Sequence, residues 1–368
     1  MGELLFVVAA ISKAIQVEDA IIERGSPILV TGGTGFIGAR VVEGLLALGF
    51  RHLRCFARPS SDAAKVEAML RRNGSSAQIE ICKGNLLSRE DCAAATRDVA
   101  VVYHLAAARG EKSFPDAFMN SVVTTRNLLE ACVRHRGVKR FLSVSSFSVY
   151  SNQDKPDGRL LDESCPVESR PELRGDAYTF AKVKQDEIVA EYGRKFDLPY
   201  VIVRPGFVYG PGNAGITGRV GIGSFGIFLH LGGSNPIPFT YVDNCADAIV
   251  LAGLKPGVDG EVFNVVDDNL PSSRRFLRLY KRNVRRFKSI YVPHFASYLL
   301  CALWEKYSTW SEGQLPLAFN RRIWHAYWKK TRYSNEKIKK RLGWVPRVPS
   351  AEALNRYFES CRMKPRNA

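Results

Sequence analysis

The sequence predicts an α/β protein in which a doubly wound parallel sheet is joined to a smaller, mostly helical C-terminal substrate lobe. Two observations carry this prediction. Short, continuously apolar stretches alternate with helical patterns as far as residue 208, which is typical of a parallel sheet covered on both faces. A glycine-rich turn also follows the first apolar stretch and precedes the first helix, as in dinucleotide-binding folds.

Each apolar stretch is short enough to be a single strand. Two long helical patterns precede the last two of these predicted strands. The segments 118–137 and 178–196 are these helices, and the second closes at Asp-Leu-Pro, 197–199. The predicted strands lie within residues 27–31, 52–58, 77–86, 99–107, 138–146 and 199–208.

The pattern divides the chain into three parts. An apolar run near the N-terminus predicts an amphipathic helix over residues 1–26. The glycine-rich segment 210–226 predicts a loop or lid. We therefore expect a Rossmann dinucleotide-binding domain over 27–205 and 237–267, and a substrate-binding lobe over 206–236 and 268–368.

Charge is unevenly distributed along the 368 residues. Residues 1–270 carry 30 Lys and Arg against 31 Asp and Glu, whereas residues 271–368 carry 23 against five and hold all five tryptophans. This basic region is compatible with peripheral contact with an anionic membrane, with a phosphorylated substrate, or with a solvated surface. No module typical of nucleic-acid binding accompanies it, so no nucleic-acid partner is expected.

The eight cysteines are scattered without a CxxC pair. This spacing favours reduced thiols over disulfides or a zinc site, so no metal is expected. We predict a cytoplasmic protein, either free or peripheral on an anionic membrane surface.

The turn "TGGTGFIG" carries the cofactor prediction. Gly32, Gly35 and Gly38 allow a tight turn and close approach to a pyrophosphate, which the helix N-terminus binds through its N–H groups. At the end of the second strand an NAD site usually has an acidic residue, but this chain has Arg58. An arginine there favours the 2′-phosphate of NADP, with NAD as the alternative.

The segment "DAYTFAKVKQDE" carries the catalytic prediction. Tyr178 and Lys182 lie four residues apart, on one face of a helix. A phenol with a pKa near ~10 is a weak base, but a neighbouring ammonium lowers that pKa. Ser145 and Ser146 end the fifth strand, where such folds bind their ligands. The same spacing at Tyr333 and Lys337 has no such strand, and we predict that it is a coincidence.

The motifs "TGGTGFIG", "YHLAA", "MNSVVTTRNLLEA", "SVSSFSVY", "YTFAK", "VIVRPGFVYGPG" and "TYVDNCADA" occur in this order over residues 28–250. Together they resemble the extended short-chain dehydrogenase/reductases, the NAD-dependent epimerase/dehydratase family. The resemblance implies that Tyr178 is the acid/base, that Lys182 lowers its pKa and holds the nicotinamide ribose, and that a serine binds the reacting oxygen. Counted from Tyr150 this serine is Ser146, with Ser145 as the second candidate.

The resemblance also implies a set of cofactor contacts along the sheet edge and a homodimer through helices 118–136 and 177–196. The cofactor residues would be Gly32, Thr34, Gly35, Phe36, Ile37, Gly38, Arg58, Asn85, Leu86, Leu105, Ala106, Ala107, Asn120, Lys182 and Pro205.

Two departures from the family pattern bear on the ligands. "GNL" replaces Gly-Asp-Leu, so Asn85 would meet the adenine amino group as a neutral partner. "RPGFVYGPG" and "IPFTYVDN" resemble members acting on 3β-hydroxysteroids more than nucleotide-sugar enzymes.

The expected function is hydride transfer between nicotinamide and a secondary alcohol or ketone of a sterol- or isoprenoid-like substrate. The alternatives are a nucleotide-sugar epimerase, dehydratase or reductase, and a non-catalytic NADP-sensing protein.

Overall fold

The computed structural model of the chain describes residues 20–60, 78–107, 113–153, 156–213, 215–224, 226–312, 314–315, 317 and 319–363. The helix predicted for residues 1–26 therefore lies mostly outside the described residues.

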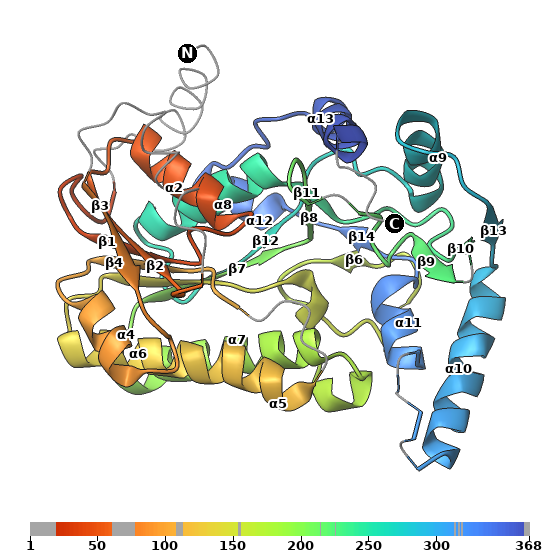
Figure 1. Cartoon of the computed structure of the whole chain (residues 1–368), viewed down its shortest axis with the longest axis horizontal. Coiled ribbons are helices and arrows are strands. Elements are labelled where there is room, and N and C mark those ends of the chain that lie inside the picture. Colours follow the sequence, from red (N-terminus) through yellow and green to blue (C-terminus); the bar gives the residue numbers. More distant parts are fainter. Residues whose placement is uncertain are drawn as a thin grey trace.

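A seven-stranded sheet forms the centre of the molecule (Figure 1). Its strand order is β12-β7-β5-β4-β1-β2-β3, and every neighbouring pair is parallel. The predicted doubly wound sheet is confirmed, and the order reverses between β1 and β4, where such folds bind ligands. The strands are β1 (Ile28–Thr31), β2 (His52–Ala57), β3 (Gln78–Lys83), β4 (Val101–His104), β5 (Arg140–Val144), β7 (Tyr200–Pro205) and β12 (Val262–Val265).

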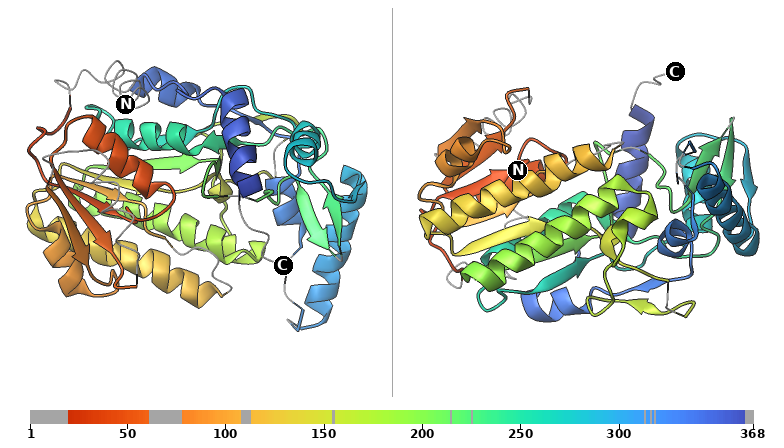
Figure 2. Two further views of the ribbon diagram at one scale, coloured as in Figure 1. Left: turned by 45° about the horizontal axis from the view of Figure 1, so that its top comes forward. Right: turned by 90° about the horizontal axis from the view of Figure 1, so that it is seen from below.

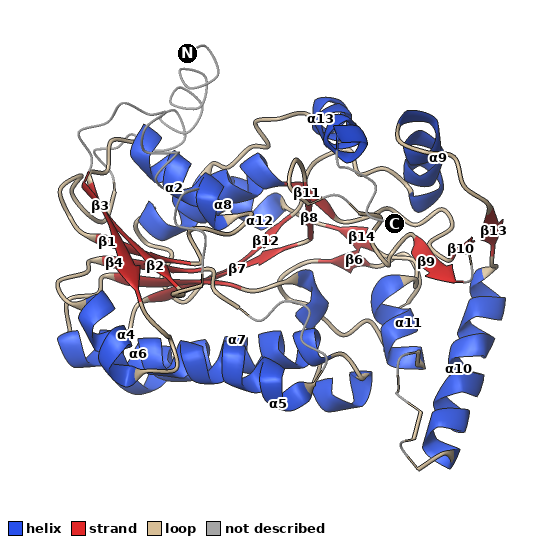
Figure 3. Ribbon diagram, viewed as in Figure 1, coloured by secondary structure: helices blue, strands red, loops and turns tan. Residues whose placement is uncertain are grey.

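Helices cover both faces of this sheet, and an apolar core fills the space on each side (Figure 3). Continuously apolar strands such as β1, buried at all four positions, follow from this double covering. One face carries α2 (Gly38–Ala47), α8 (Val242–Leu254) and α12 (Glu336–Leu342). The other carries α4 (Arg89–Thr96), α5 (Phe114–Ala117), a π-helical turn (Phe118–Val123), α6 (Thr124–His135) and α7 (Ala177–Phe196).

The C-terminal lobe lies beyond the carboxyl ends of the strands and is helical as predicted (Figure 2). Its helices are α9 (Ser273–Asn283), α10 (His294–Trp310), α11 (Arg321–Tyr327) and α13 (Ser350–Met363). Short 3₁₀ turns form at Phe147–Val149 and Pro171–Arg174.

One small sheet lies within this lobe, and two others join it to the rest of the chain. They are β9 (Gly221–Ser224) with β10 (Ile227–His230) and β13 (Ser289–Tyr291), β8 (Phe207–Tyr209) with β11 (Phe239–Tyr241), and β6 (Leu160–Leu161) with β14 (Arg332–Tyr333).

The glycine-rich segment 210–226 is not entirely the loop that its composition predicts. Gly221 and Gly223 belong to β9, which pairs with β10 in an antiparallel hairpin. A Cβ atom at Gly221 would lie 2.0 Å from the carbonyl oxygen of Leu229. Glycine is therefore present here for close strand contact and not for chain flexibility.

Candidate active site

The glycine turn between β1 and α2 can be built only from glycine at two of its positions. Gly32 has a φ of +71°, and a Cβ atom there would lie 3.0 Å from the backbone nitrogen of Ala106. A Cβ atom at Gly38 would lie 2.1 Å from the carbonyl oxygen of Gly32. No side chain caps α2 and its first turn holds no acidic residue. This cradle, which includes Thr34, Gly35, Phe36 and Ile37, fits a pyrophosphate.

The residues predicted to hold the adenosine end follow β2 and β3. Arg58 comes directly after β2, is exposed, and forms no ion pair with any described residue. Asn85 is also exposed, and its Oδ1 accepts a hydrogen bond from the backbone N–H of Leu87 at 3.0 Å. Leu86 is buried beneath them. The two polar side chains are thus accessible at the edge where an adenosine would bind.

A buried polar network, which the sequence interpretation missed, ties the glycine turn to α7. Thr31 Oγ1 and His104 Nδ1 are 2.8 Å apart, and His104 Nε2 lies 2.9 Å from Thr125 Oγ1. Gln185 donates from α7 to Thr125 at 2.8 Å, and Ala106 N donates to Thr31 Oγ1 at 3.2 Å. Burial, with a contribution from the Lys182 charge, lowers the pKa of His104 to about 3, so this ring is neutral. A histidine ending an apolar strand is the sequence signal for this network.

The remaining predicted cofactor residues surround this network. Leu105, Ala106 and Ala107 follow β4 and are partly buried. Asn120 is exposed on the π-helical turn, a distortion that often marks functional sites. Pro205 ends β7 and is buried.

The predicted catalytic helix α7 begins beside the carboxyl end of β5. Asp176 caps it by accepting a hydrogen bond from Tyr178 N at 3.1 Å, and the Tyr178 side chain is 37% exposed. One turn later, the buried Lys182 donates from Nζ to the carbonyl of Val144, the last residue of β5, at 2.7 Å. Burial lowers the pKa of Lys182 to about 8, and the carboxylate of Asp186 opposes this shift.

The two candidate serines have different surroundings. Ser145 is buried, and its hydroxyl helps to lower the pKa of Asp186, although it forms no hydrogen bond of standard geometry with a described residue. Ser146 is only partly buried, and its Oγ accepts from Ser148 N at 3.1 Å. Because Ser145 is turned into the protein interior, this geometry favours Ser146 as the serine that would meet a substrate.

A second polar group absent from the sequence interpretation lies behind the serines. Arg204 of β7 pairs with the buried Asp186 at 2.9 Å, and its guanidinium lies 4.9 Å from the ring centroid of Tyr150. Tyr150 in turn donates to Asn264 Oδ1 at 2.7 Å. These contacts join α7, β7 and β12 behind Lys182. The signal in the sequence is an arginine inside the apolar strand "VIVRP".

The second Tyr-x-x-x-Lys pair does not share one helix face. Tyr333 belongs to β14, and its hydroxyl accepts from Arg219 at 3.4 Å. Lys337 belongs to α12 and forms an ion pair with Glu261 at 2.6 Å. The spacing at this pair therefore lacks the helical geometry of Tyr178 and Lys182.

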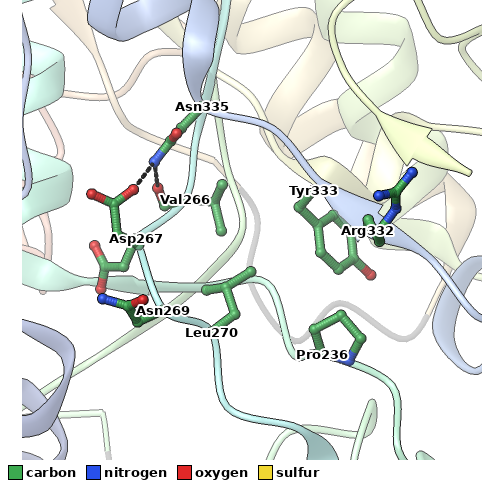
Figure 4. A pocket seen from close by; sticks show the side chains of 9 residues that line it. Pro236, Val266, Asp267, Asn269, Leu270, Arg332, Tyr333 and Asn335 are labelled. Atoms are coloured by element: carbon green, nitrogen blue, oxygen red, sulfur yellow. Dashed lines mark hydrogen bonds between the residues drawn. The ribbon is translucent and has the colours of Figure 1, made fainter. Parts of the chain in front are cut away.

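A pocket of about 280 Å³ opens beyond β12, between the sheet and the C-terminal lobe (Figure 4). Tyr333 lines it and stacks on Phe147, the residue after Ser146, with ring centroids 5.7 Å apart. Val266 and Leu270 share an apolar cluster with Phe147. The pocket therefore adjoins the predicted catalytic serine. Its lining is Pro236, Val266, Asp267, Asp268, Asn269, Leu270, Arg332, Tyr333 and Asn335.

The fold and the glycine cradle define a dinucleotide-binding α/β protein. The chain belongs to the NAD dependent epimerase/dehydratase family, whose model matches residues 28–265. The resemblance inferred from the sequence motifs is thus confirmed.

Curated relatives in this family differ in their substrates. The chain is 30% identical over 186 residues to cinnamoyl-CoA reductase 1 of Oryza sativa subsp. japonica, covering 50% of this chain and 54% of that protein. It is 28% identical over 256 residues to 3beta-hydroxysteroid-dehydrogenase/decarboxylase isoform 1 of Arabidopsis thaliana, covering 64% of this chain and 54% of that protein. The chain thus spans about half of the length of these two relatives.

A solved structure with the same fold is the UDP-glucuronic acid 4-epimerase of Bacillus cereus in complex with NAD. The two chains superpose with a TM-score of 0.67 at 22% identity, covering 91% of this chain and 98% of the other.

Proposed function

We propose that this chain is an NAD(P)-dependent oxidoreductase that transfers a hydride between nicotinamide and a secondary alcohol or ketone. The observation that carries the proposal is the position of Lys182. Its buried ammonium lies one helical turn from Tyr178 and is held against the carboxyl end of β5, one residue before the serine pair. A buried cation has a desolvation cost, so its retention beside an exposed phenol favours a catalytic role.

In this proposal each residue has a separate task at the reacting carbon. Bound nicotinamide would supply or accept the hydride. Ser146 would donate a hydrogen bond from its hydroxyl to the substrate oxygen and hold that oxygen in place. Tyr178 would give its phenolic proton to that oxygen in reduction, or take it in oxidation. The positive charge of Lys182 would stabilise the resulting phenolate.

The proposed substrate is a hydrophobic, sterol- or isoprenoid-like hydroxy or keto compound. Support comes from the similarity to a 3β-hydroxysteroid dehydrogenase/decarboxylase and from the apolar side chains of Val266, Leu270 and Tyr333 in the pocket. None of the six arginines of residues 274–286 lines this pocket, and all six are exposed, which disfavours a substrate diphosphate held by them.

A nucleotide sugar is the second candidate substrate. It is favoured by the similarity to a trifunctional UDP-glucose 4,6-dehydratase of Arabidopsis thaliana, 27% identical over 255 residues and covering 65% of this chain and 36% of that protein. Arg332 at the pocket also provides a cation for a phosphate.

The choice between these two substrates can be tested by mass spectrometry. The purified chain is measured under native conditions, and the ligand released by denaturation is then identified. A sterol- or isoprenoid-like ligand supports the first candidate, and a nucleotide diphosphate sugar supports the second. Cofactor turnover must then be measured with the identified compound. If the chain binds cofactor and shows no turnover that depends on Tyr178, the remaining alternative, a non-catalytic NADP-sensing protein, replaces both.

Within this function we propose NADP as the preferred cofactor. The exposed Arg58 at the end of β2, which forms no ion pair with a described residue, is positioned as an arginine for a 2′-phosphate would be. NAD is the alternative, in keeping with the family as a whole.

We also propose a cytoplasmic homodimer that contacts anionic membranes through its basic C-terminal region. The helices 118–136 and 177–196 lie next to each other on one side of the sheet (Figure 2). Met119 at the start of the first helix is 45% exposed and Phe196 at the end of the second is 43% exposed, and both would supply apolar surface to such a contact. Light scattering of the purified chain would give the oligomeric state.

A further inference from the structure

Helix α10 has an inverted arrangement of apolar and polar residues. Its inner face packs on α11, and Ser297, Cys301 and Ser308 are buried there. Tyr298 and Trp304 flank this face, and their rings pack on Trp324 and Phe319. Its outer face carries large apolar side chains that are 48–78% exposed: Phe295, Leu299, Leu300, Leu303, Tyr307 and Trp310. Among the described residues, none covers this stripe, and Ile290 of β13, which precedes α10, is 54% exposed as well.

An exposed apolar stripe of this size is unusual for a water-facing surface. Figure 1 shows that α10 forms the outer edge of the lobe, away from the sheet. Its 17 residues are too few to span a bilayer, which needs roughly 20. None of the helices that the structure describes is long and apolar enough to cross a membrane. A helix of this kind can lie within a membrane interface.

The surroundings of the stripe are strongly cationic. Residues 271–310 contain nine Lys and Arg and a single acid, Glu305, which is paired with Arg321 at 2.9 Å. All six arginines of residues 274–286 are exposed, and none forms an ion pair with a described residue. In Figure 1, α9, β13 and α10 follow one another along the same edge of the molecule.

The apolar face of α9 is directed differently. Phe276, Leu277 and Tyr280 are buried against α13, so α9 presents only its cations to the outside. The aromatic residues of α9 therefore cannot enter a membrane while the lobe keeps its fold. The outward apolar groups belong to α10.

We propose that the outer face of α10 inserts into the interface of an anionic membrane, with the arginines of α9 and of the following segment held against the lipid headgroups. The inference rests on the membrane contact proposed above and names the residues that would enter the bilayer. Tyr307 and Trp310 lie on the stripe, as aromatic residues commonly do at membrane interfaces. A second copy of this chain is disfavoured as the covering partner, because two such cationic edges would repel each other.

Flotation of the full chain with phosphatidylcholine vesicles, with and without phosphatidylglycerol, tests this proposal. The chain should float only with the anionic vesicles, and binding should fade between roughly 0.05 and 0.5 M salt. The double variant Leu299→Ser/Leu303→Ser should lose at least about tenfold in partition, since it removes two inserted side chains. Leu173→Ser is the matched control, because Leu173 is 43% exposed outside this edge, and it should float as the wild type does.

Two further measurements separate the ways in which the proposal could be wrong. If the wild type ignores anionic vesicles at low salt, both the membrane contact and the role of α10 are refuted. If the wild type and the double serine variant float equally, the contact is purely electrostatic and α10 does not insert. If light scattering shows that the double variant dissociates a dimer, a second copy covers the stripe and the membrane assignment is wrong. Quenching by brominated lipid that disappears in Trp310→Phe would support insertion directly.

Discussion

Helices α7 and α10, with 20 and 17 residues, are the two longest helices described in the chain, and each places some of its side chains in an unfavourable environment. Helix α7 buries the polar groups Lys182, Gln185 and Asp186 under the sheet. Helix α10 buries two serines and a cysteine and leaves most of its large apolar side chains exposed. Packing within the chain explains neither the buried charges of α7 nor the exposed apolar side chains of α10.

The comparison suggests a rule: a buried charge points to catalysis, whereas an exposed apolar surface points to a binding partner. Burying a charge is costly unless it is paired or used, and the buried charges of α7 surround a predicted catalytic site. Exposing apolar surface is costly unless a partner covers it, and the exposed apolar groups of α10 form the proposed docking surface. The dinucleotide-binding half would therefore hold the chemistry, while the lobe would hold the molecule at its place of action.

The largest effect is expected at the exposed end of α7. Tyr178→Phe removes the proposed proton donor and should lower turnover by about 10² or more, because general acid–base catalysis contributes roughly this much. Cofactor affinity should stay nearly unchanged, since the ring remains. Turnover and cofactor binding are measured on the same preparation.

Tyr333→Phe is the control for this experiment. Among the described residues its hydroxyl contacts only Arg219, at the long distance of 3.4 Å. Because phenylalanine keeps the ring that lines the pocket, loss of the hydroxyl should leave turnover almost unchanged. Equal losses in the two variants would show that the assignment of the catalytic tyrosine is wrong.

The buried charge of Lys182 should appear in the pH dependence of stability. Its pKa is about 8 in the folded chain, lowered by burial from 10.5. Between these pH values the unfolded chain binds more protons, so this group makes stability rise with pH; below about 8 both states are protonated and its contribution is constant. The unfolding free energy of the wild type minus that of Lys182→Met should therefore increase by about 3 kcal/mol across that pH window. A flat difference in urea denaturation at several pH values would contradict the burial of this ammonium.

The sequence was sufficient to predict the sheet and the catalytic helix because both depend on local patterns. Strands buried on both faces are continuously apolar, and Tyr178 and Lys182 lie one helical turn apart on α7. The network of His104 and the ion pair of Arg204 with Asp186 could not be predicted, since their partners are distant in the chain. The outward stripe of α10 was also hidden, because its apolar composition suits a buried helix equally well.

The next effect concerns the cofactor cradle of the same half. Gly38→Ala places a Cβ atom 2.1 Å from the carbonyl oxygen of Gly32, and the overpacked turn should destabilise the chain by about 2 kcal/mol and weaken cofactor binding. Gly44→Ala in the same helix is the control, since its Cβ would lie 3.3 Å from a methyl group of Val250. Thermal unfolding with and without cofactor measures both changes. If Gly44→Ala loses as much cofactor affinity as Gly38→Ala, the cradle is not the binding site.

A smaller effect is expected at Arg58. Because this side chain is exposed, Arg58→Ala should weaken NADP binding by about 1.5 kcal/mol, roughly tenfold, and leave NAD binding nearly unchanged. Titration of both cofactors into the two proteins measures this difference. Equal affinities of the wild type for NAD and NADP would remove the basis for preferring NADP.

The smallest effect should come from the outer face of α10, and it separates the two helices most directly. Leu303 is 56% exposed, so Leu303→Ser should change the free energy of unfolding by no more than about 0.5 kcal/mol in the absence of lipid. On α7 the fully buried Val189 has the opposite environment, and Val189→Ser should cost at least about 2 kcal/mol through lost packing and a buried hydroxyl. Chemical denaturation of both variants measures the contrast. A large loss for Leu303→Ser would mean that the stripe packs against part of this chain, and α10 would then have no free face to dock with.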